Sequence, residues 1–191
     1  MIKAVLLDFF GVLYPDTFWG LADKYLPERD DEVQADLHEL IRKVDLDLVD
    51  KNKFWNEAAQ LFKVDLVELE TAKNAMGGVD DRLLDLCKDL KQKGIKTGVI
   101  SNAGSGFVER GIGDDYQDYF DVIVSSGDSG VMKPDREIYA IACDKLGFKP
   151  EDCIFFDDIQ RNVNGAIAAG LHAELYSGFN KCKKLIETDI K

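Results

Sequence analysis

The sequence predicts an α/β protein with a doubly wound parallel sheet and a small, all-helical second domain. Short apolar runs that end in polar residues alternate with helical patterns at the N-terminus and through residues 80–191. Residues 14–79 instead show helical spacing throughout and contain no convincing strand pattern. We therefore assign 1–13 and 80–191 to the sheet domain, and 14–79 to a helical domain inserted after its first strand.

The first strand is predicted by the run Ala4-Val-Leu-Leu followed by Asp8. Four apolar residues without alternation are typical of a strand that is buried on both faces, as in parallel sheets. Phe9, Phe10 and Gly11 then take the chain away from the strand. Asp8 is therefore expected at the carboxyl end of a strand, where open α/β sheets bind their ligands.

The helical insertion begins where Tyr14-Pro15-Asp16 interrupts the strand, and Thr17 is expected to cap a helix that starts at Phe18. Three further groups of apolar residues recur at helical spacing and predict the remaining helices: 33–44, 54–62 and 66–76. With about 66 residues, this domain is too small to build a large core of its own, so we expect it to pack against the sheet domain.

The second half of the chain supplies the rest of the sheet and its helices. Strands are expected at 96–100, 120–124, 153–156 and 173–176, and helices at 83–90, 138–146, 163–169 and from about 181.

Composition narrows the function. The 191 residues are 46% hydrophobic and carry a net charge of −12 with no basic run, so a nucleic-acid partner is not expected. The four cysteines are far apart without a Cys-x-x-Cys motif and are expected to be buried free thiols. No apolar run approaches the roughly 20 residues of a membrane span, and the chain opens on a strand rather than a signal peptide. We expect a cytoplasmic protein that does not insert into membranes.

Polar residues gather at the ends of the predicted strands. Ser101 and Asn102 follow the second strand, and Asp157-Asp158 end the fourth. Lys133-Pro134 precedes a helix, and Pro134 in its first turn would hold Lys133 just outside the N-terminus. Taken singly, these residues also have structural explanations: a strand end or a helix cap for the polar residues, a solvated surface position for the lysine.

In this order, the four segments around Asp8, Ser101, Lys133 and Asp157-Asp158 resemble the signatures of the haloacid dehalogenase-like hydrolase superfamily. The resemblance implies a Rossmann-like core and a substrate-selecting cap formed by the helical insertion. It also implies that Asp8 is a nucleophile, which forms an aspartyl phosphate that is hydrolysed in a second step. The expected substrate is a small phosphorylated metabolite.

The resemblance also assigns the binding residues. Lys133 offsets the charges of the phosphate and the nucleophile, while Ser101, Asn102 and Ala103 form an anion cradle at the start of a helix. The expected cofactor is Mg²⁺, because adjacent carboxylates need a cation between them and Asp8. Its implied ligands are Asp8, the Phe10 carbonyl and Asp158, with Asp157 and Asn162 ordering its waters or Lys133.

Phe10 departs from the family pattern. Phosphatases of the superfamily usually carry there a second aspartate that protonates the leaving oxygen, and phenylalanine cannot move a proton. A 2-haloacid dehalogenase needs no such acid, but its chemistry uses no metal and leaves Asp157-Asp158 unexplained. A phosphonatase needs a distinctive cap lysine, which the sequence does not show. A binding module that holds a phosphorylated ligand without turnover would share the cradle. The magnesium-dependent phosphatase accounts for more of the residues, and Asp16 is a further candidate for the missing acid.

Overall fold

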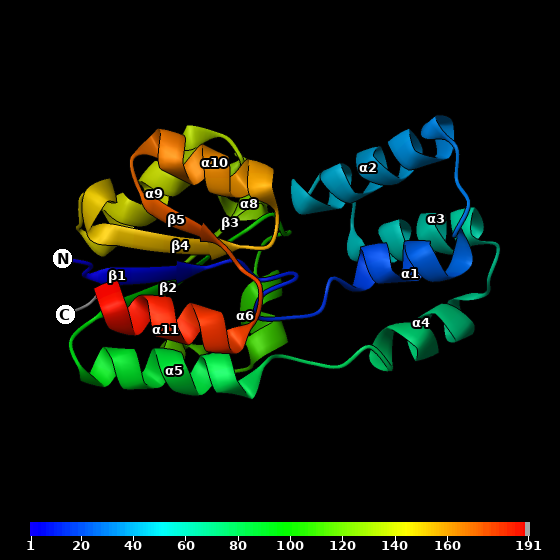
Figure 1. Ribbon diagram of the computed structural model, residues 1–191. Helices are drawn as coiled ribbons and strands as arrows, with labels where there is room; N and C mark the ends of the chain where they lie inside the picture. Colours follow the sequence, from blue (N-terminus) through cyan, green and yellow to red (C-terminus); the bar gives the residue numbers. More distant parts are fainter. Residues whose placement is uncertain (190–191) are drawn as a thin grey trace.

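The computed structural model, which describes residues 1–189, contains one five-stranded parallel sheet in the order β3-β2-β1-β4-β5 (Figure 1). The strands are β1 Ala4–Leu7, β2 Lys96–Ser101, β3 Val122–Ser125, β4 Cys153–Asp157 and β5 His172–Leu175. The predicted α/β class with a Rossmann-like parallel sheet is confirmed, and the strands lie within two residues of their predicted bounds.

Helices cover both faces of the sheet, because β1 is apolar at every position and its side chains alternate between the faces. Val5 and Leu7 belong to the apolar cluster under two of the helices, and Ala4 and Leu6 belong to the cluster under the other two. Figure 1 shows the two pairs on opposite sides of the sheet. The pairs are α5 Asp81–Gln92 with α11 Phe179–Asp189, and α9 Arg136–Leu146 with α10 Gln160–Ala169.

The inserted segment forms four helices that share a separate apolar core, in which Phe18, Leu37 and Phe54 are buried. These helices are α1 Thr17–Tyr25, α2 Asp31–Asp45, α3 Lys51–Phe62 and α4 Leu66–Asn74. Figure 1 shows them together beyond the end of the sheet toward which β1 runs. The expected helices are therefore present, whereas the division at residues 13 and 79 into two domains stays a prediction.

An aspartate side chain caps each of these four helices by accepting a backbone N–H. The prediction that Thr17 caps the first helix is wrong by one residue. Asp16 is the cap, and its Oδ1 accepts from Trp19 N at 3.3 Å. Aspartate is a stronger acceptor than threonine at this position, because its charge also favours the positive end of the helix dipole.

Several short helices were not predicted from the sequence, because elements of three to six residues have no measurable apolar period. They are α6 Phe107–Ile112, α7 Tyr116–Tyr119, α8 Ser126–Ser129 and the 3₁₀ turn Pro150–Asp152. All four cysteines are buried free thiols, as expected. Within residues 1–189, no helix combines the length and the apolar character that crossing a membrane requires.

The order of the strands places the functional candidates. From β1 the chain builds outward through β2 and β3 on one side, and through β4 and β5 on the other. The carboxyl ends of β1, β2 and β4 are therefore neighbours at a topological switch point, where open α/β sheets form their binding crevice. Asp8, Ser101 and Asp157 lie at these three ends.

Candidate active site

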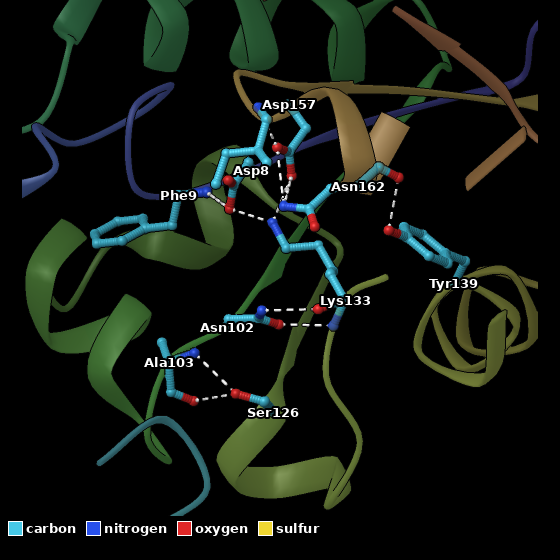
Figure 2. A network of polar contacts seen from close by, with 10 residues as sticks. Asp8, Phe9, Asn102, Ala103, Ser126, Lys133, Tyr139, Asp157 and Asn162 are labelled. Carbon is cyan, nitrogen blue, oxygen red and sulfur yellow. Dashed lines mark hydrogen bonds and ion pairs between the residues drawn. The ribbon is translucent and has the colours of Figure 1, made fainter. Parts of the chain in front are cut away.

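Asp8 is the centre of the polar network in Figure 2. Although a carboxylate is rarely buried without partners, this residue is only 4% exposed. Its Oδ1 accepts from the backbone N–H of Phe9 at 2.6 Å and forms an ion pair with Lys133 Nζ, also at 2.6 Å. No hydrogen bond to Oδ2 occurs within residues 1–189. One oxygen of Asp8 is thus fixed, and the other is available for chemistry.

Lys133 links the ends of two strands. Its ammonium lies 2.6 Å from Asp8 Oδ1 and 2.7 Å from Asp157 Oδ2, and the side chain is 1% exposed. The loop that carries it is held by the Asn102 side chain, which accepts from Lys133 N at 2.8 Å and donates to Lys133 O at 3.1 Å. Asn102 therefore fixes the backbone of Lys133, and the two carboxylates fix its ammonium.

The predicted helical position of Pro134 is wrong. Helix α9 begins at Arg136 with Asp135 as its N-cap, and Pro134 follows a cis peptide bond after Lys133. The pair occupies a turn that is closed by the hydrogen bond from Asp135 N to Met132 O at 2.8 Å. A proline in a turn and a proline in a first helical turn have the same local sequence pattern, so the pattern did not distinguish them.

Asp157 is buried and uses both of its carboxylate oxygens. Besides the Lys133 ion pair, Oδ1 accepts from Ile159 N at 2.8 Å, and Asn162 Nδ2 lies 3.1 Å from each oxygen. Tyr139 Oη donates to the Asn162 carbonyl at 2.8 Å and ties this network to α9 (Figure 2). The contacts place Asp157 as the partner that orients Lys133.

Asp158 presents a carboxylate that retains contact with solvent. It lies close to the backbone of Gly11, where a Cβ atom would come within 2.2 Å of Asp158 Oδ2. Gly11 has φ +83°, so this position needs glycine both for its backbone conformation and for space. Oxygens of Asp8, Asp157 and Asp158 lie within 4.8 Å of one another. Such a cluster of hard oxygen donors suits a divalent cation such as Mg²⁺.

The charges of this cluster perturb its protonation. Burial, followed by the repulsion of Asp157 and Asp158, raises the pKa of Asp8 well above its ordinary value although Lys133 acts in the opposite direction. Burial and the Asp157 charge likewise raise the pKa of Asp158. Burial lowers the pKa of Lys133, but Asp8 and Asp157 outweigh it and the net pKa is raised. The lysine therefore stays an ammonium, and the excess negative charge favours a bound cation.

The predicted anion cradle is only partly present. Ser101 is fully buried at the end of β2, and its hydroxyl has no hydrogen-bond partner among residues 1–189. The expected helix does not follow directly, because α6 begins only at Phe107. The N–H of Ala103 is donated to Ser126 Oγ at 2.9 Å, so the geometry does not support the predicted contact from Ala103 to an anion. The Asn102 side chain is engaged with the Lys133 loop.

Phe10 is half-buried and packs in a group of aromatic rings. Its ring centroid is 5.4 Å from that of Phe107 and 6.3 Å from that of Tyr14. Lys51, from the helical insertion, places its ammonium 5.9 Å from the centre of the Phe107 ring. The side chain at position 10 therefore packs among aromatic rings, and a phenylalanine there cannot carry a proton.

Sequence reasoning missed Asp45, a buried acidic residue at the end of α2. Burial raises the pKa of Asp45, and the charges of Asp8 and Lys133 also act on it. A signal was present, because Leu37, Ile41 and Asp45 follow one another at four-residue intervals and so share one face of the helix. Leu37 is buried. An acidic residue in line with a buried face is uncommon enough to mark a site candidate.

Comparisons with known proteins agree with this geometry. A family model described as haloacid dehalogenase-like hydrolase matches residues 2–170. Phosphatase MT3486 of Mycobacterium tuberculosis is 34% identical over 113 residues, which cover 58% of this chain and 51% of that protein. Glyceraldehyde 3-phosphate phosphatase of Methanothermobacter thermautotrophicus is 26% identical over 197 residues, which cover 92% of this chain and 85% of that protein. The chain spans about half the length of the first relative.

The structural neighbours share the architecture over nearly the whole chain. The HAD family enzyme BT-2542 from Bacteroides thetaiotaomicron superposes with a TM-score of 0.74 at 20% identity, covering 97% of this chain and 98% of that one. The same enzyme in complex with magnesium and inorganic phosphate superposes with a TM-score of 0.70, covering 93% and 95%. At this level of identity the similarity establishes the fold.

Proposed function

Because the chain belongs to the haloacid dehalogenase-like hydrolase family, we propose that it is a magnesium-dependent phosphatase of a small phosphorylated metabolite. The observation that carries this proposal is the buried Asp8–Lys133–Asp157 network beside three gathered carboxylates. Relatives named as phosphatases, and a neighbour solved with magnesium and phosphate, support the same chemistry.

Asp8 acts as the nucleophile. Its Oδ1 is held by Phe9 N and Lys133, which leaves Oδ2 to form the bond to phosphorus and release the alcohol or acid portion of the substrate. The resulting acyl phosphate is far more reactive than a phosphate ester, so water can hydrolyse it in a second step. Fixing one oxygen limits the rotation of the carboxylate and presents the other in a constant direction.

Lys133 and Ser101 receive the phosphoryl group. The Lys133 ammonium offsets the charge that accumulates near Asp8, and a preorganised charge in a buried site acts with little screening. The Ser101 hydroxyl is a buried donor without a partner in residues 1–189, and a phosphoryl oxygen would satisfy it. Asp157 and Asn162 hold the lysine in place.

The donor set fits Mg²⁺, which prefers a few carboxylates together with substrate oxygens and waters. Asp8 and Asp158 would hold it, with the backbone carbonyl of Phe10 as a third ligand. Asp157 is engaged with Lys133 and Asn162, so we place it behind this shell rather than in it. When bound, the cation neutralises charge on the phosphoryl oxygens and the carboxylates. The helical insertion acts as the cap that selects the substrate.

Phe10 limits the leaving groups that this site can expel by itself. Without an acid at position 10, anomeric sugar phosphates and acyl phosphates, whose leaving groups are stable as anions, depend least on protonation. The three gathered carboxylates favour this metal-assisted phosphatase over a dehalogenase, for which they have no use.

The proposal is tested by phosphate release from a panel of sugar phosphates and acetyl phosphate, with Mg²⁺ and with EDTA. Wild type, Asp8→Asn and Phe10→Asp are compared, and halide release from 2-haloacids is measured in parallel. Release that requires both Mg²⁺ and Asp8 supports the proposal. Full activity of a clean Asp8→Asn preparation would falsify it, and activity gained only in Phe10→Asp would indicate a binding module.

A further inference from the structure

Asp45 is a buried acid that the proposed function leaves unused. It is the last residue of α2 and is 7% exposed, in the same range as Asp8, Asp157 and Lys133. Those three side chains are paired with one another, whereas the carboxyl of Asp45 forms no hydrogen bond or ion pair with any part of residues 1–189. Burial of a carboxyl without a protein donor disfavours the anion and therefore favours the protonated form.

The end of α2 is fixed against the loops that bear the site. Ser126 Oγ donates to the Asp45 carbonyl at 2.6 Å, and the same hydroxyl accepts from Ala103 N. Two residues on, Asp47 Oδ2 accepts from Ser105 N at 3.0 Å and from the Ser105 hydroxyl. The contacted residues of this loop, Ala103 and Ser105, lie two and four residues beyond Ser101. The end of α2 is therefore joined to the loop that begins at the proposed phosphate site.

Glycines allow this close approach. A Cβ at Gly104 would come within 2.6 Å of Asp47 Oδ1 and 3.0 Å of the Val44 carbonyl. At Gly127 it would come within 2.7 Å of Asp47 Oδ2. The two loop backbones therefore pack closely on the end of α2, and the Asp45 backbone is held there by the Ser126 and Asp47 side chains.

The charges that act on Asp45 include two from the reacting centre, those of Asp8 and Lys133. Burial raises the pKa of Asp45 well above its ordinary value, and the charge of Asp16 is the next largest cause. Lys133 acts in the opposite direction, while Asp8 and Asp47 raise the pKa further. The charges of Asp8 and Lys133 thus act on Asp45, although neither residue forms a hydrogen bond or ion pair with it.

We propose that Asp45 is the proton donor that position 10 lacks, and that it extends the substrates to phosphate esters of aliphatic alcohols. The inference rests on the proposed function. As the bond from Asp8 to phosphorus forms, the bond from phosphorus to the leaving oxygen breaks, and that oxygen keeps the electron pair and takes the Asp45 proton. In the second step, water attacks phosphorus and returns a proton to Asp45, while Asp8 is released.

Three other titratable groups near the reacting centre are already committed to partners. Lys133 is held as an ammonium between Asp8 and Asp157, and Asp157 accepts hydrogen bonds on both oxygens. Asp16, the candidate from the sequence, accepts Trp19 N as the cap of α1. Asp45 alone among these acids is both buried and unbonded within residues 1–189, and so is the one best able to hold a proton and release it.

Asp45→Asn tests the role with substrates that differ in leaving group. We expect kcat for glycerol phosphate to fall by about 10²–10⁴-fold, and kcat for p-nitrophenyl phosphate and acetyl phosphate to fall less than about tenfold. The alkaline limb of the pH profile for glycerol phosphate should disappear as well. Asp36→Asn makes the same chemical change at an exposed position on the same helix and should leave every rate unchanged.

Three outcomes would overturn the inference: an equal loss on all substrates, no loss on glycerol phosphate, or a selective loss in Asp16→Asn instead. If wild type releases no phosphate even from acetyl phosphate, the proposed function itself fails, and this result is separate from the others. Asp45→Ser, which is smaller and also lacks a titrating group, gives the same comparison if Asp45→Asn does not fold.

Discussion

Replacing Lys133 by methionine should destabilise the protein strongly and in a pH-dependent way. The substitution keeps the aliphatic stem but removes an ammonium that lies 2.6 Å from Asp8 and 2.7 Å from Asp157. All three side chains are almost fully buried, at 1%, 6% and 0% exposure. Breaking a buried ion pair by removing one partner costs about 3–5 kcal/mol, because the remaining charge is left uncompensated.

The structure also sets an upper limit to this loss. The variant can relieve the charge if one carboxyl takes up a proton, and an ordinary aspartate has a pKa of 3.8. At pH 7, protonating it costs about 4 kcal/mol, since each pH unit above the pKa corresponds to about 1.4 kcal/mol. At pH 5 the same step costs only about 1.6 kcal/mol. The loss of stability should therefore be about 4 kcal/mol at pH 7 and less than half of that at pH 5.

Urea unfolding of wild type and Lys133→Met at pH 5 and pH 7, in EDTA, measures these differences. Lys149→Met is the matched control, because its ion pair with Glu151 is exposed at 77% and 74% and should contribute less than about 1 kcal/mol. Saturating Mg²⁺ should recover part of the stability that Lys133→Met loses. A loss below about 1 kcal/mol at pH 7, or one that does not change with pH, would refute the reasoning.

Three other substitutions test separate parts of the site. Asp8→Asn should lower phosphate release by about 10⁴-fold or more in steady-state assays, because the amide is a poor nucleophile, while thermal unfolding shows an intact fold. Gly11→Ala places a Cβ 2.2 Å from Asp158 Oδ2 and should weaken Mg²⁺ binding by about tenfold or more in calorimetric titration; unchanged affinity would contradict the role of Asp158. Asp16 has a pKa raised to about 6 by burial and by Asp158, so the native state holds its proton more tightly than the unfolded state and stability falls as pH rises from about 4 to 6. Asp16→Asn keeps the helix cap. In EDTA it should raise the free energy of unfolding by about 3 kcal/mol at pH 7 and by little near pH 4. Urea titrations that show equal gains at both pH values would exclude this linkage.

The sheet and the main site residues were predictable because they depend on local patterns. A buried apolar run that ends in Asp8 or Asp157 fixes both the strand and the edge at which its last residue lies. Parallel strands bring their carboxyl ends together, so Asp8, Ser101 and Asp157 had to be neighbours once their strands were assigned. Lys133 was expected just outside a helix from a placement of Pro134 that is wrong, and its role beside Asp8 came from the resemblance to the family.

Other features depend on contacts between distant segments, which a local pattern does not determine. The Ala103 N–H is taken by Ser126, 23 residues later in the chain, and this pairing interrupts the expected cradle. Asp45 is joined to Ser126 across 81 residues. Its sequence pattern indicates only an acidic residue on a mostly apolar helix face. Whether such a residue is buried depends on what packs against the helix, and this is decided by the tertiary structure.

The charge of the site links the metal to the proposed proton donor. Asp8, Asp157 and Asp158 would carry three negative charges when ionised, against one positive charge on Lys133, which leaves −2 before a phosphate dianion arrives. Mg²⁺ would bring this sum to zero, so substrate binding should be weak until the cation is present. A further carboxylate at Asp45 would restore the repulsion, whereas a neutral Asp45 would not. The same shortage of positive charge that calls for a cation therefore favours a proton on Asp45 at the moment when the leaving oxygen needs one.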